Sequence, residues 1–456
     1  MKNKLLLSRM RNVIFAIAFV LLAVALIIGA FGSTWDARAL VAPAETLGGF
    51  TYEIAGGAHG EAAFPYSLEN LAPNMAVTVY ANIEPGKYEN LLVKTVYTRL
   101  RLYADDALIY ECGQPGSYPS WLLDPPTLLK IVPLPQAASE LRFEYISPSQ
   151  RTTMSLPDIA AGSDGALSAW LFAKNVALLS VSIFLLILGL AATIISLLFQ
   201  RGGAVFLHLG LFALAAGCWS FGECNATAFL VPYPVLLYLM AFGGLFSLAI
   251  PLLRYGLLII SPKKPRPMRL AATILEAAVI VALALQLTGT VALSKSMYVF
   301  HIIVPLALVV FAATTVYEHF RHKNPMAKRF ALPILVIAAF AILEVVNYSL
   351  RFTDVLSLFF LLGTLIFTLM LGVIGVRYAA DTRMAYEEAA AKNDFYHKMS
   401  HGLRTPMTVV STCIQTVRRR PTEAAELLPE AQTEIMKIAK MIDDALEDGD
   451  EGEVRP

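Results

Sequence analysis

A histidine near the C-terminal end of the chain has surroundings that suit nucleophilic chemistry. His401 stands in the segment Ser400-His401-Gly402-Leu403-Arg404-Thr405-Pro406. At about 100° per residue on a helix, its side chain lies about 200° from Leu403 and about 180° from Val410. Because both of those residues are apolar, the imidazole is expected to face away from the apolar side and into water. A solvated neutral imidazole nitrogen is a nucleophile and a proton acceptor.

Two helices are expected to position this histidine. Apolar residues around it recur at alternating spacings of four and three, which is typical of a helical bundle, at Leu403, Met407, Val410, Ile414 and Val417. A second helix is expected after Pro421, since proline suits the first helical turn. Its apolar residues form two repeats with a period of seven, Leu428, Ile435, Ile442 and Ala431, Ile438, Ala445. Two helices cannot bury all these stripes alone, so we expect two chains to pair into a four-helix bundle.

The motif around His401 closely resembles the H-box of bacterial sensor histidine kinases. The resemblance rests on the order Ser400-His401-x-Leu403-Arg404-Thr405-Pro406 inside a predicted helical hairpin, and it covers roughly residues 385–447. It implies a dimerisation and phosphoacceptor domain. His401 would take the γ-phosphoryl group of ATP and pass it to an aspartate of a response regulator.

The same resemblance assigns roles to the neighbours of His401. Thr405, one helical turn on, matches the position that helps to place water for dephosphorylation, and Arg404 belongs to the motif. Pro406 lacks a backbone N–H, so a kink just past the acceptor is expected.

Two features depart from the family pattern. Gly402 stands where the family usually has an acidic residue that orients the imidazole and accepts its proton. Only 55 residues follow His401, whereas a nucleotide-binding α/β domain needs more than about 100. We therefore expect no ATP-binding domain and no cofactor in this chain, with ATP and Mg²⁺ handled by a separate catalytic domain.

The composition of the whole chain indicates a membrane protein. Of its 456 residues, 57% are apolar and only 16% are charged, whereas soluble domains are nearer a quarter charged. The net charge of +1 gives no indication of a nucleic-acid partner. The four cysteines, among them Cys112 and Cys224, are too few and too scattered for a disulfide scaffold or a zinc site.

Eight runs are long enough to cross a bilayer, which needs about 20 apolar residues. They lie near residues 13–31, 175–199, 204–221, 234–253, 270–288, 298–317, 330–348 and 355–376. Basic residues concentrate in alternate loops, including Arg254, Lys263, Lys264, Arg266 and Arg269. By the positive-inside rule these loops are cytoplasmic, so residues 34–169 are expected outside and the tail from Arg377 inside.

The first run has two interpretations, a retained membrane anchor or a secretory signal peptide. It is longer than the apolar part of a signal peptide, and no clear cleavage site follows. We therefore expect an anchor.

Residues 34–169 are expected to form antiparallel strands. Polar and apolar residues alternate over 77–80, 99–103 and 141–145, and Asp105-Asp106 fits a hairpin turn between two strands. Several short strands favour a β-sandwich or jelly roll. Trp35, Tyr118 and Trp121 either form a stacking platform for a ligand or are ordinary core aromatics, and we expect the second.

The upstream region more loosely resembles receptors that have seven membrane helices, diverse intracellular signalling modules and an outer jelly-roll domain. The residues that carry this resemblance are the strand-turn-strand of 103–113 and the plan of one span plus seven. By analogy with other β-sandwich and jelly-roll folds, an unidentified small-molecule ligand is expected outside the membrane.

Ionisable residues inside spans are candidates for a ligand or proton site, because each is costly in lipid unless it is paired or hydrated. Glu223 and Glu344 lie near the outer ends of their spans and are also explained by contact with interfacial water. Lys174 enters the second span. Glu276 lies deeper, and a transporter that depends on it is an alternative function. The chain shows no internal repeat of the kind that transporters have.

Together these patterns predict a mixed fold, a polytopic α-helical membrane protein with an outer β-sandwich or jelly roll and a cytoplasmic dimeric helical hairpin. The expected parts are an anchor at 1–33, a sensor domain at 34–169, seven spans at 170–376, a helical linker at 377–394, the phosphoacceptor hairpin at 395–447 and an acidic tail at 448–456. We expect a multi-pass protein of the bacterial inner membrane that acts in a two-component phosphorelay as a homodimer. Its expected partners are the lipid bilayer, a response regulator and a separate kinase chain. The alternative from another class is a receptor or scaffold without catalysis.

Overall fold

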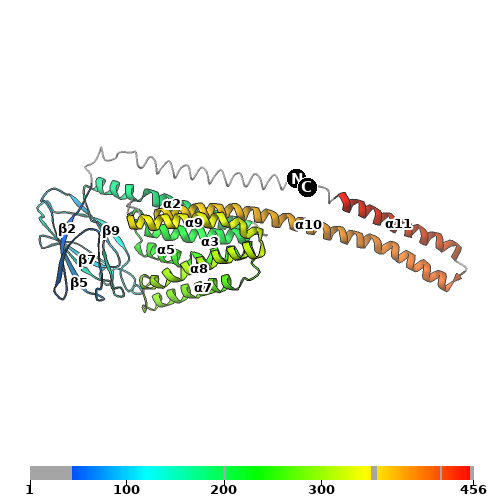
Figure 1. Ribbon diagram of the computed structural model, residues 1–456, viewed down its shortest axis with the longest axis horizontal. Coiled ribbons are helices and arrows are strands. Elements are labelled where there is room, and N and C mark those ends of the chain that lie inside the picture. The colour runs from blue at the N-terminus through cyan, green and yellow to red at the C-terminus, as the bar shows by residue number, and fades with distance from the viewer. Residues whose placement is uncertain (1–43, 199–201, 351–356, 422–423, 452–456) are drawn as a thin grey trace. The chain divides into compact units, whose positions relative to one another are not determined.

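The chain forms two compact units, residues 1–379 and 380–456. The computed structural model describes residues 44–198, 202–350, 357–421 and 424–451. In the first unit, antiparallel sheets adjoin a bundle of long helices (Figure 1). The mostly helical architecture with a separate β region is therefore confirmed, whereas the predicted span at 13–31 and Trp35 lie outside the described residues.

The β region holds twelve strands among the described residues. A six-stranded sheet has the order β3-β2-β5-β10-β7-β8, a four-stranded sheet the order β1-β12-β6-β9, and β11 pairs with β4. The strand bounds are β1 Glu45–Thr46, β2 Gly49–Ile54, β3 Ala58–Ala63, β4 Tyr66–Leu68, β5 Ala76–Asn82, β6 Asn90–Thr95, β7 Arg99–Ala104, β8 Ala107–Cys112, β9 Leu128–Pro133, β10 Glu140–Ile146, β11 Met154–Leu156 and β12 Ala160–Gly162.

The three alternating segments of the sequence form the middle of the six-stranded sheet. They are β5, β7 and β10, and β10 pairs antiparallel with both of the others, with Phe143 opposite Val79 and Leu102. Every second side chain of these strands is buried, as a period of two predicts. Residues of the four-stranded sheet, Leu91 and Val132, join them in one apolar core, so the two large sheets bury their inner faces against each other.

The predicted hairpin turn at Asp105-Asp106 is confirmed. Ala104 pairs with Ala107, so the loop has two residues, and both aspartates have positive φ, 45° and 69°, as tight hairpins require. The Asp105 carboxylate accepts hydrogen bonds from the backbone N–H of Glu140 at 2.9 Å and of Ser139 at 3.1 Å. These bonds hold the pKa of Asp105 below its usual value and tie the turn to the start of β10.

The helices follow the strands along the chain. Seven segments of the described residues, with α5 and α6 counted together, are long and apolar enough to cross a membrane, and they overlap the last seven predicted spans. The helix bounds are α2 Asp164–Leu198, α3 Gly203–Glu223, α4 Asn225–Leu230, α5 Pro234–Ser247, α6 Ala249–Ile260, α7 Arg266–Leu287, α8 Leu293–His322, α9 Pro325–Leu350, α10 Leu358–Arg419 and α11 Ala424–Glu451.

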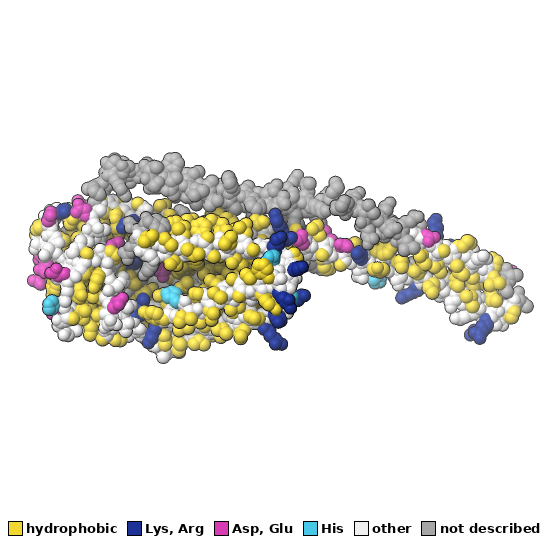
Figure 2. Space-filling view, viewed as in Figure 1, with side chains coloured by type: hydrophobic (Ala, Val, Ile, Leu, Met, Phe, Trp, Pro, Cys, Tyr) yellow, Lys and Arg dark blue, Asp and Glu magenta, His cyan; other side chains and the backbone are white. Residues whose placement is uncertain are grey.

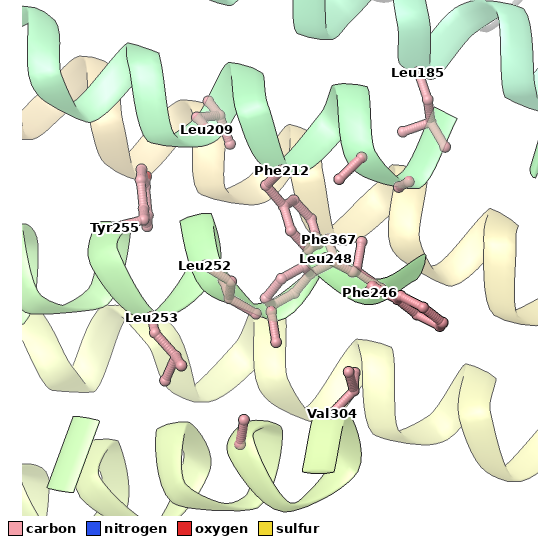
Figure 3. Packing of buried hydrophobic residues seen from close by; sticks show 14 of the residues in the cluster. Leu185, Leu209, Phe212, Phe246, Leu248, Leu252, Leu253, Tyr255, Val304 and Phe367 are labelled. Atoms are coloured by element: carbon pink, nitrogen blue, oxygen red, sulfur yellow. The ribbon is translucent and has the colours of Figure 1, made fainter. Parts of the chain in front are cut away.

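The bundle has its own core of apolar side chains (Figure 3). Phe212 of α3 meets Phe367 of α10 edge-on, with ring centroids 5.8 Å apart. Phe246 of α5 stacks on Phe300 of α8, with centroids 3.7 Å apart. Aromatic contacts of this kind add to the dispersion energy that holds the helices together.

Two glycines bring α2 and α3 into close contact. A Cβ on Gly210 would lie 2.8 Å from the carbonyl oxygen of Gly189, and one on Gly189 would lie 2.9 Å from the carbonyl oxygen of Gly210. Real Cβ atoms do not approach so closely, so only glycine permits this backbone contact.

Side-chain amides join the β region to the bundle. Gln286 of α7 is 1% exposed; it donates to the carbonyl oxygen of Trp121 at 2.7 Å and accepts from the Tyr238 hydroxyl at 3.1 Å. Gln150 accepts from the N–H of Ala292 at 2.9 Å. The side chains of Tyr118 and Trp121 pack against the bundle core, so these two are packing aromatics, as expected.

Lys and Arg side chains gather at the end of the bundle away from the sheets (Figure 2). The exposed basic residues of the connections include Lys263 and Lys264 between α6 and α7 and Lys323 between α8 and α9, with Arg266 and Lys328 in the first turns of α7 and α9. The basic loops therefore share one end of the bundle, as the topology from the sequence requires. Arg254 is an exception, because it lies within α6 and not in the loop to which the sequence pattern assigns it.

The cysteines of the first unit are unpaired. Cys112 and Cys224 are both buried and free. The Cys112 thiol lies 4.0 Å from the Thr95 hydroxyl, and the Cys224 thiol lies 3.9 Å from the amide oxygen of Asn175.

The substitution Gly210→Ala tests the close packing of α2 on α3. Its Cβ overlaps the backbone of α2, and we expect a loss of about 1–3 kcal/mol of stability, as overpacking costs elsewhere. Thermal unfolding of the reconstituted chain measures this. The control is Gly372→Ala, whose Cβ would meet only a leucine methyl at 3.7 Å. Equal unfolding temperatures for the two variants would contradict the packing account.

Candidate phosphoacceptor site

The second unit is a hairpin of two long helices. Its first helix is the C-terminal part of α10 and its second is α11. Three ion pairs at the helical spacing of four support α10: Arg383 with Glu387 at 2.9 Å, Lys392 with Glu388 at 3.0 Å and Lys398 with Asp394 at 2.8 Å. Each pair adds a few tenths of a kcal/mol to helix stability, so this segment holds the helical form around His401.

The imidazole of His401 is exposed, as the apolar periodicity predicts. His397, one helical turn earlier, is also exposed, and the two rings are nearly parallel with their centroids 6.5 Å apart. The site therefore presents two imidazoles on one side of α10. Only the second of them precedes the Leu-Arg-Thr-Pro sequence.

The other predicted site residues follow on the same helix. Arg404 and Thr405 are exposed, and Pro406 is buried. Because α10 is continuous through Pro406, this proline does not end the helix, and the expected kink stays a prediction. Thr405 lies one turn after His401, which places both side chains on the same face.

Gly402 faces the second helix of the hairpin. A Cβ added there would lie 3.4 Å from the sulfur of Met441 in α11, which is ordinary contact with the end of a flexible side chain. The absence of a side chain at this position is therefore not forced by packing. It leaves the imidazole of His401 without a carboxylate at the next residue.

The interior of the hairpin differs from the apolar stripe that the sequence suggests. Pro406, Cys413 and Ala431 are buried, while Met407 is 61% exposed and Ile414 is 55% exposed. One helix partner covers only a narrow strip of α10, so the predicted seam is divided. Part of the seam packs against α11, and the rest is exposed to solvent.

The second helix shows the same division. Ala431 is buried and Ile438 half-buried, whereas Leu428 is 53%, Ile435 52% and Ile442 41% exposed. The three exposed residues are the first of the two repeats that the sequence shows, and Ala431 and Ile438 belong to the second. The side chain of Ala445, the last member of the second repeat, lies outside the described residues. We call Met407, Ile414, Leu428, Ile435 and Ile442 the exposed stripe.

Two of the candidate ionisable residues of the first unit, Glu344 and Lys174, have structural partners. The carboxylate of Glu344 accepts from the backbone N–H of Ser357 at 2.7 Å and of Phe359 at 3.0 Å, so it caps the start of α10. The ammonium of Lys174 lies 4.2 Å from the ring centroid of Trp170. These two residues therefore act in helix capping and packing.

Glu276 forms an ion pair that the sequence pattern missed. Two nitrogens of Arg254 donate to its carboxylate at 2.7–3.1 Å. The two residues are 22 positions apart on α6 and α7, so no local spacing reveals the pair. The signal that was available is the coincidence of one cation and one anion within adjacent apolar helices.

Glu223, the remaining candidate, lies at the C-terminal end of α3 near the β region. The neighbouring Lys94 of β6 donates to the amide oxygen of Asn225 at 2.7 Å. Burial lowers the pKa of Lys94, and the charge of Glu223 opposes this effect.

Among the described residues, no group of three His, Cys, Asp or Glu side chains could hold a metal ion.

Comparison with known proteins supports the assignment of the hairpin. Residues 391–452 match the family of the His Kinase A (phospho-acceptor) domain. The match covers the exposed histidine, Arg404, Thr405 and both helices of the hairpin. The predicted histidine-kinase phosphoacceptor module is thereby confirmed at the level of the domain family.

Other comparisons add nothing about function. No curated protein matches the chain. Among solved structures, the K1 cleaved adhesin domain of Lys-gingipain from Porphyromonas gingivalis W83 is similar at 12% identity, with 27% of this chain and 92% of that chain covered and a TM-score of 0.17. A TM-score this low carries no argument about fold.

The substitution Gly402→Ala tests whether this glycine loosens the helix at the site. Alanine in a helix interior is favoured over glycine by about 1 kcal/mol, so backbone amides around His401 should exchange about fivefold more slowly. Hydrogen exchange followed by mass spectrometry measures this in the full chain. Ala390→Gly, an exposed position earlier in the same helix, should speed exchange locally. Unchanged exchange in Gly402→Ala would show that the helix is already rigid there.

Proposed function

We propose that this chain is a membrane sensor of a two-component phosphorelay, with His401 as the phosphoacceptor. The observation that carries the proposal is an exposed imidazole, in the motif Ser-His-x-Leu-Arg-Thr-Pro, inside a hairpin that matches a phosphoacceptor domain family. The transfer to a response regulator and the sensing role are proposals that go beyond this match.

The proposed step is a nucleophilic displacement at phosphorus. A neutral ring nitrogen of His401 attacks the γ-phosphorus of ATP, the bond to the β-phosphate oxygen breaks, and ADP leaves. A carboxylate oxygen of the response regulator later attacks the phosphorus of phosphohistidine; an O–P bond forms, the N–P bond breaks, and the imidazole leaves in its original form. Since the ring is exposed, both partners can reach it in turn.

Residues beside His401 support the two steps. Arg404, three residues on, lies on the same helical face and can pair with the phosphoryl oxygens. Thr405 carries the hydroxyl that would place a water for dephosphorylation. Gly402 supplies no carboxylate, so the partner that provides ATP would also provide the group that takes the imidazole proton.

The proposal assigns the ATP-binding step to a separate catalytic domain that acts on His401 in trans. The outward position of the imidazole suits this arrangement, because a separate domain needs unobstructed access. It also means that phosphorylation of the chain depends on a partner that recognises the hairpin.

Dimerisation is the second part of the proposal. The exposed stripe runs along both helices, and large apolar side chains repeated every seven residues are usually covered by another helix. A second copy brings an identical stripe and completes a four-helix bundle. His401 lies about 180° from Val410 on the helix, so it would stay outside such a bundle.

The first unit is assigned to sensing in the membrane. Its seven apolar segments fit a bilayer. Its basic loops would face the cytoplasm and the β region would lie outside. One continuous helix, α10, contains both the last apolar segment and His401. A change in the first unit therefore has a direct covalent route to the phosphoacceptor.

Phosphorylation in trans tests the acceptor. We expect the full chain, incubated with the catalytic domain of a complete histidine kinase and ATP, to gain acid-labile phosphate. The label should vanish in His401→Gln, because the nucleophile is lost. It should persist in His397→Gln, which removes the neighbouring exposed imidazole and leaves the motif intact.

Autoradiography after acid and alkaline treatment reads the result. Label that survives in His401→Gln and disappears in His397→Gln would show that His397 is the acceptor, and the proposal for His401 would be wrong. Absence of label in the parent chain, with the kinase shown to be active on its own substrate, would favour a receptor or scaffold without catalysis.

Cysteine cross-linking tests the dimer. Ile435→Cys places a thiol in the exposed stripe, so oxidation should join two chains into a disulfide-linked dimer on a non-reducing gel. Lys437→Cys is the matched control, since its side chain is 61% exposed but points about 200° away from position 435. Equal cross-linking of both variants would indicate random collision, and the proposed interface would be wrong.

A further inference from the structure

A cavity of about 560 Å³ opens between α3, α5, α6 and α7 in the first unit. This volume lies in the range of pockets that hold one small ligand. Its lining follows one face of the α5–α6 pair and one face of α3, with Glu276 as the contribution of α7. The residues of the lining that matter here are His208, Leu211 and Leu214 of α3, Leu239 and Gly243 of α5, and Arg254 of α6.

The cavity is long and has unlike ends. From Leu239 to Arg254 the lining extends over about 22 Å of helix at 1.5 Å per residue, much of the hydrocarbon thickness of a bilayer. Leu239, Met240 and Cys218 form its apolar end. Arg254, Glu276 and His208 form its polar end, about 9 Å inside the basic end of α6.

Hydrogen-bond donors remain available at the polar end. Arg254 uses Nε and Nη2 for Glu276, and no hydrogen bond of its Nη1 is found within the described part of the chain. The same holds for the His208 ring. The ion pair is neutral as a whole, and Arg254 is 44% and Glu276 35% exposed toward the space around them. These free donors can bind a ligand head group that accepts hydrogen bonds.

The backbone of α5 leaves room in the cavity, nearer its apolar end. Gly243 is exposed, and a Cβ added to it would meet nothing within 4 Å. Its neighbour Gly244 is different, because a Cβ there would collide with the backbone of α3. Gly244 thus allows α5 to pack directly on the backbone of α3, whereas Gly243 faces the open space of the cavity.

We propose that this cavity binds a single-chain amphiphile with a carboxylate head, a long-chain fatty acid. The chain lies along the leucines of α3 and α5, and the carboxylate accepts hydrogen bonds from Nη1 of Arg254 and from His208. The cavity volume favours one acyl chain over the two chains of a bilayer lipid. The inference rests on the membrane insertion proposed above and does not depend on phosphorylation of His401.

Photolabelling of the full chain in lipid nanodiscs tests the site. The probe is palmitic acid that carries a diazirine in its chain, and labelled peptides are mapped by mass spectrometry. We expect label on peptides of α3 and α5–α6. Excess palmitate should remove it, while excess hexadecane, which has the tail without the head, should not.

Two variants and one control locate the binding. Gly243→Leu fills the cavity without a backbone clash and should lower labelling about tenfold. Arg254→Lys keeps the charge opposite Glu276 but loses the second donor nitrogen, and it should lower labelling severalfold. Val281→Leu adds bulk on an exposed part of α7 outside the cavity and should leave labelling unchanged.

Three outcomes would overturn the proposal. Label spread evenly over all the lipid-facing helices, or label unchanged in Gly243→Leu, would show only general solvation by the bilayer. Equal competition by hexadecane and palmitate would show that no head group is recognised. Because labelling is read without ATP, a failure here is distinct from a failure of phosphoryl transfer to His401.

Discussion

A hairpin of two helices buries only one strip of each helix and leaves the other apolar side chains exposed. The proposed dimer and the proposed acceptor both depend on this incomplete burial. In the second unit the strip is occupied by Pro406, Cys413 and Ala431. Met407 and Ile435 remain 61% and 52% exposed. Burying their apolar surface would lower the free energy by roughly 25 cal/mol per Å². The same geometry turns His401 away from both apolar strips. The proposed pairing of two chains and the accessible imidazole thus follow from one arrangement of side chains.

Much of the fold could be predicted from the sequence, because its strongest signals are local. A run of about 20 apolar residues has few alternatives to a membrane helix, and seven of the predicted runs coincide with apolar helices of the structure. Alternation with a period of two located β5, β7 and β10, and the pair Asp105-Asp106 located a hairpin turn. The phosphoacceptor motif was recognisable because its residues are adjacent in the chain.

The rest depends on contacts between distant segments, which no local pattern contains. Arg254 looked like part of a basic loop, yet helix α6 continues past it and places it against Glu276, 22 residues away. Glu344 looked like a residue at the membrane surface, yet its carboxylate caps α10. The apolar seam of α10 was read as one stripe because the spacing does not say which part α11 covers. In each case the partner, and not the residue itself, determines the role.

The central claim is that His401 carries a phosphoryl group between two proteins. The most direct measurement starts from the full chain labelled with ³²P and freed of kinase and ATP, and adds the receiver domain of a response regulator. The account predicts that label leaves the chain and appears in equal amount on the aspartate of that receiver domain, and that a receiver domain without this aspartate gains none. Label that stays on the chain, or that is released only as inorganic phosphate with every receiver domain tried, would contradict the phosphorelay.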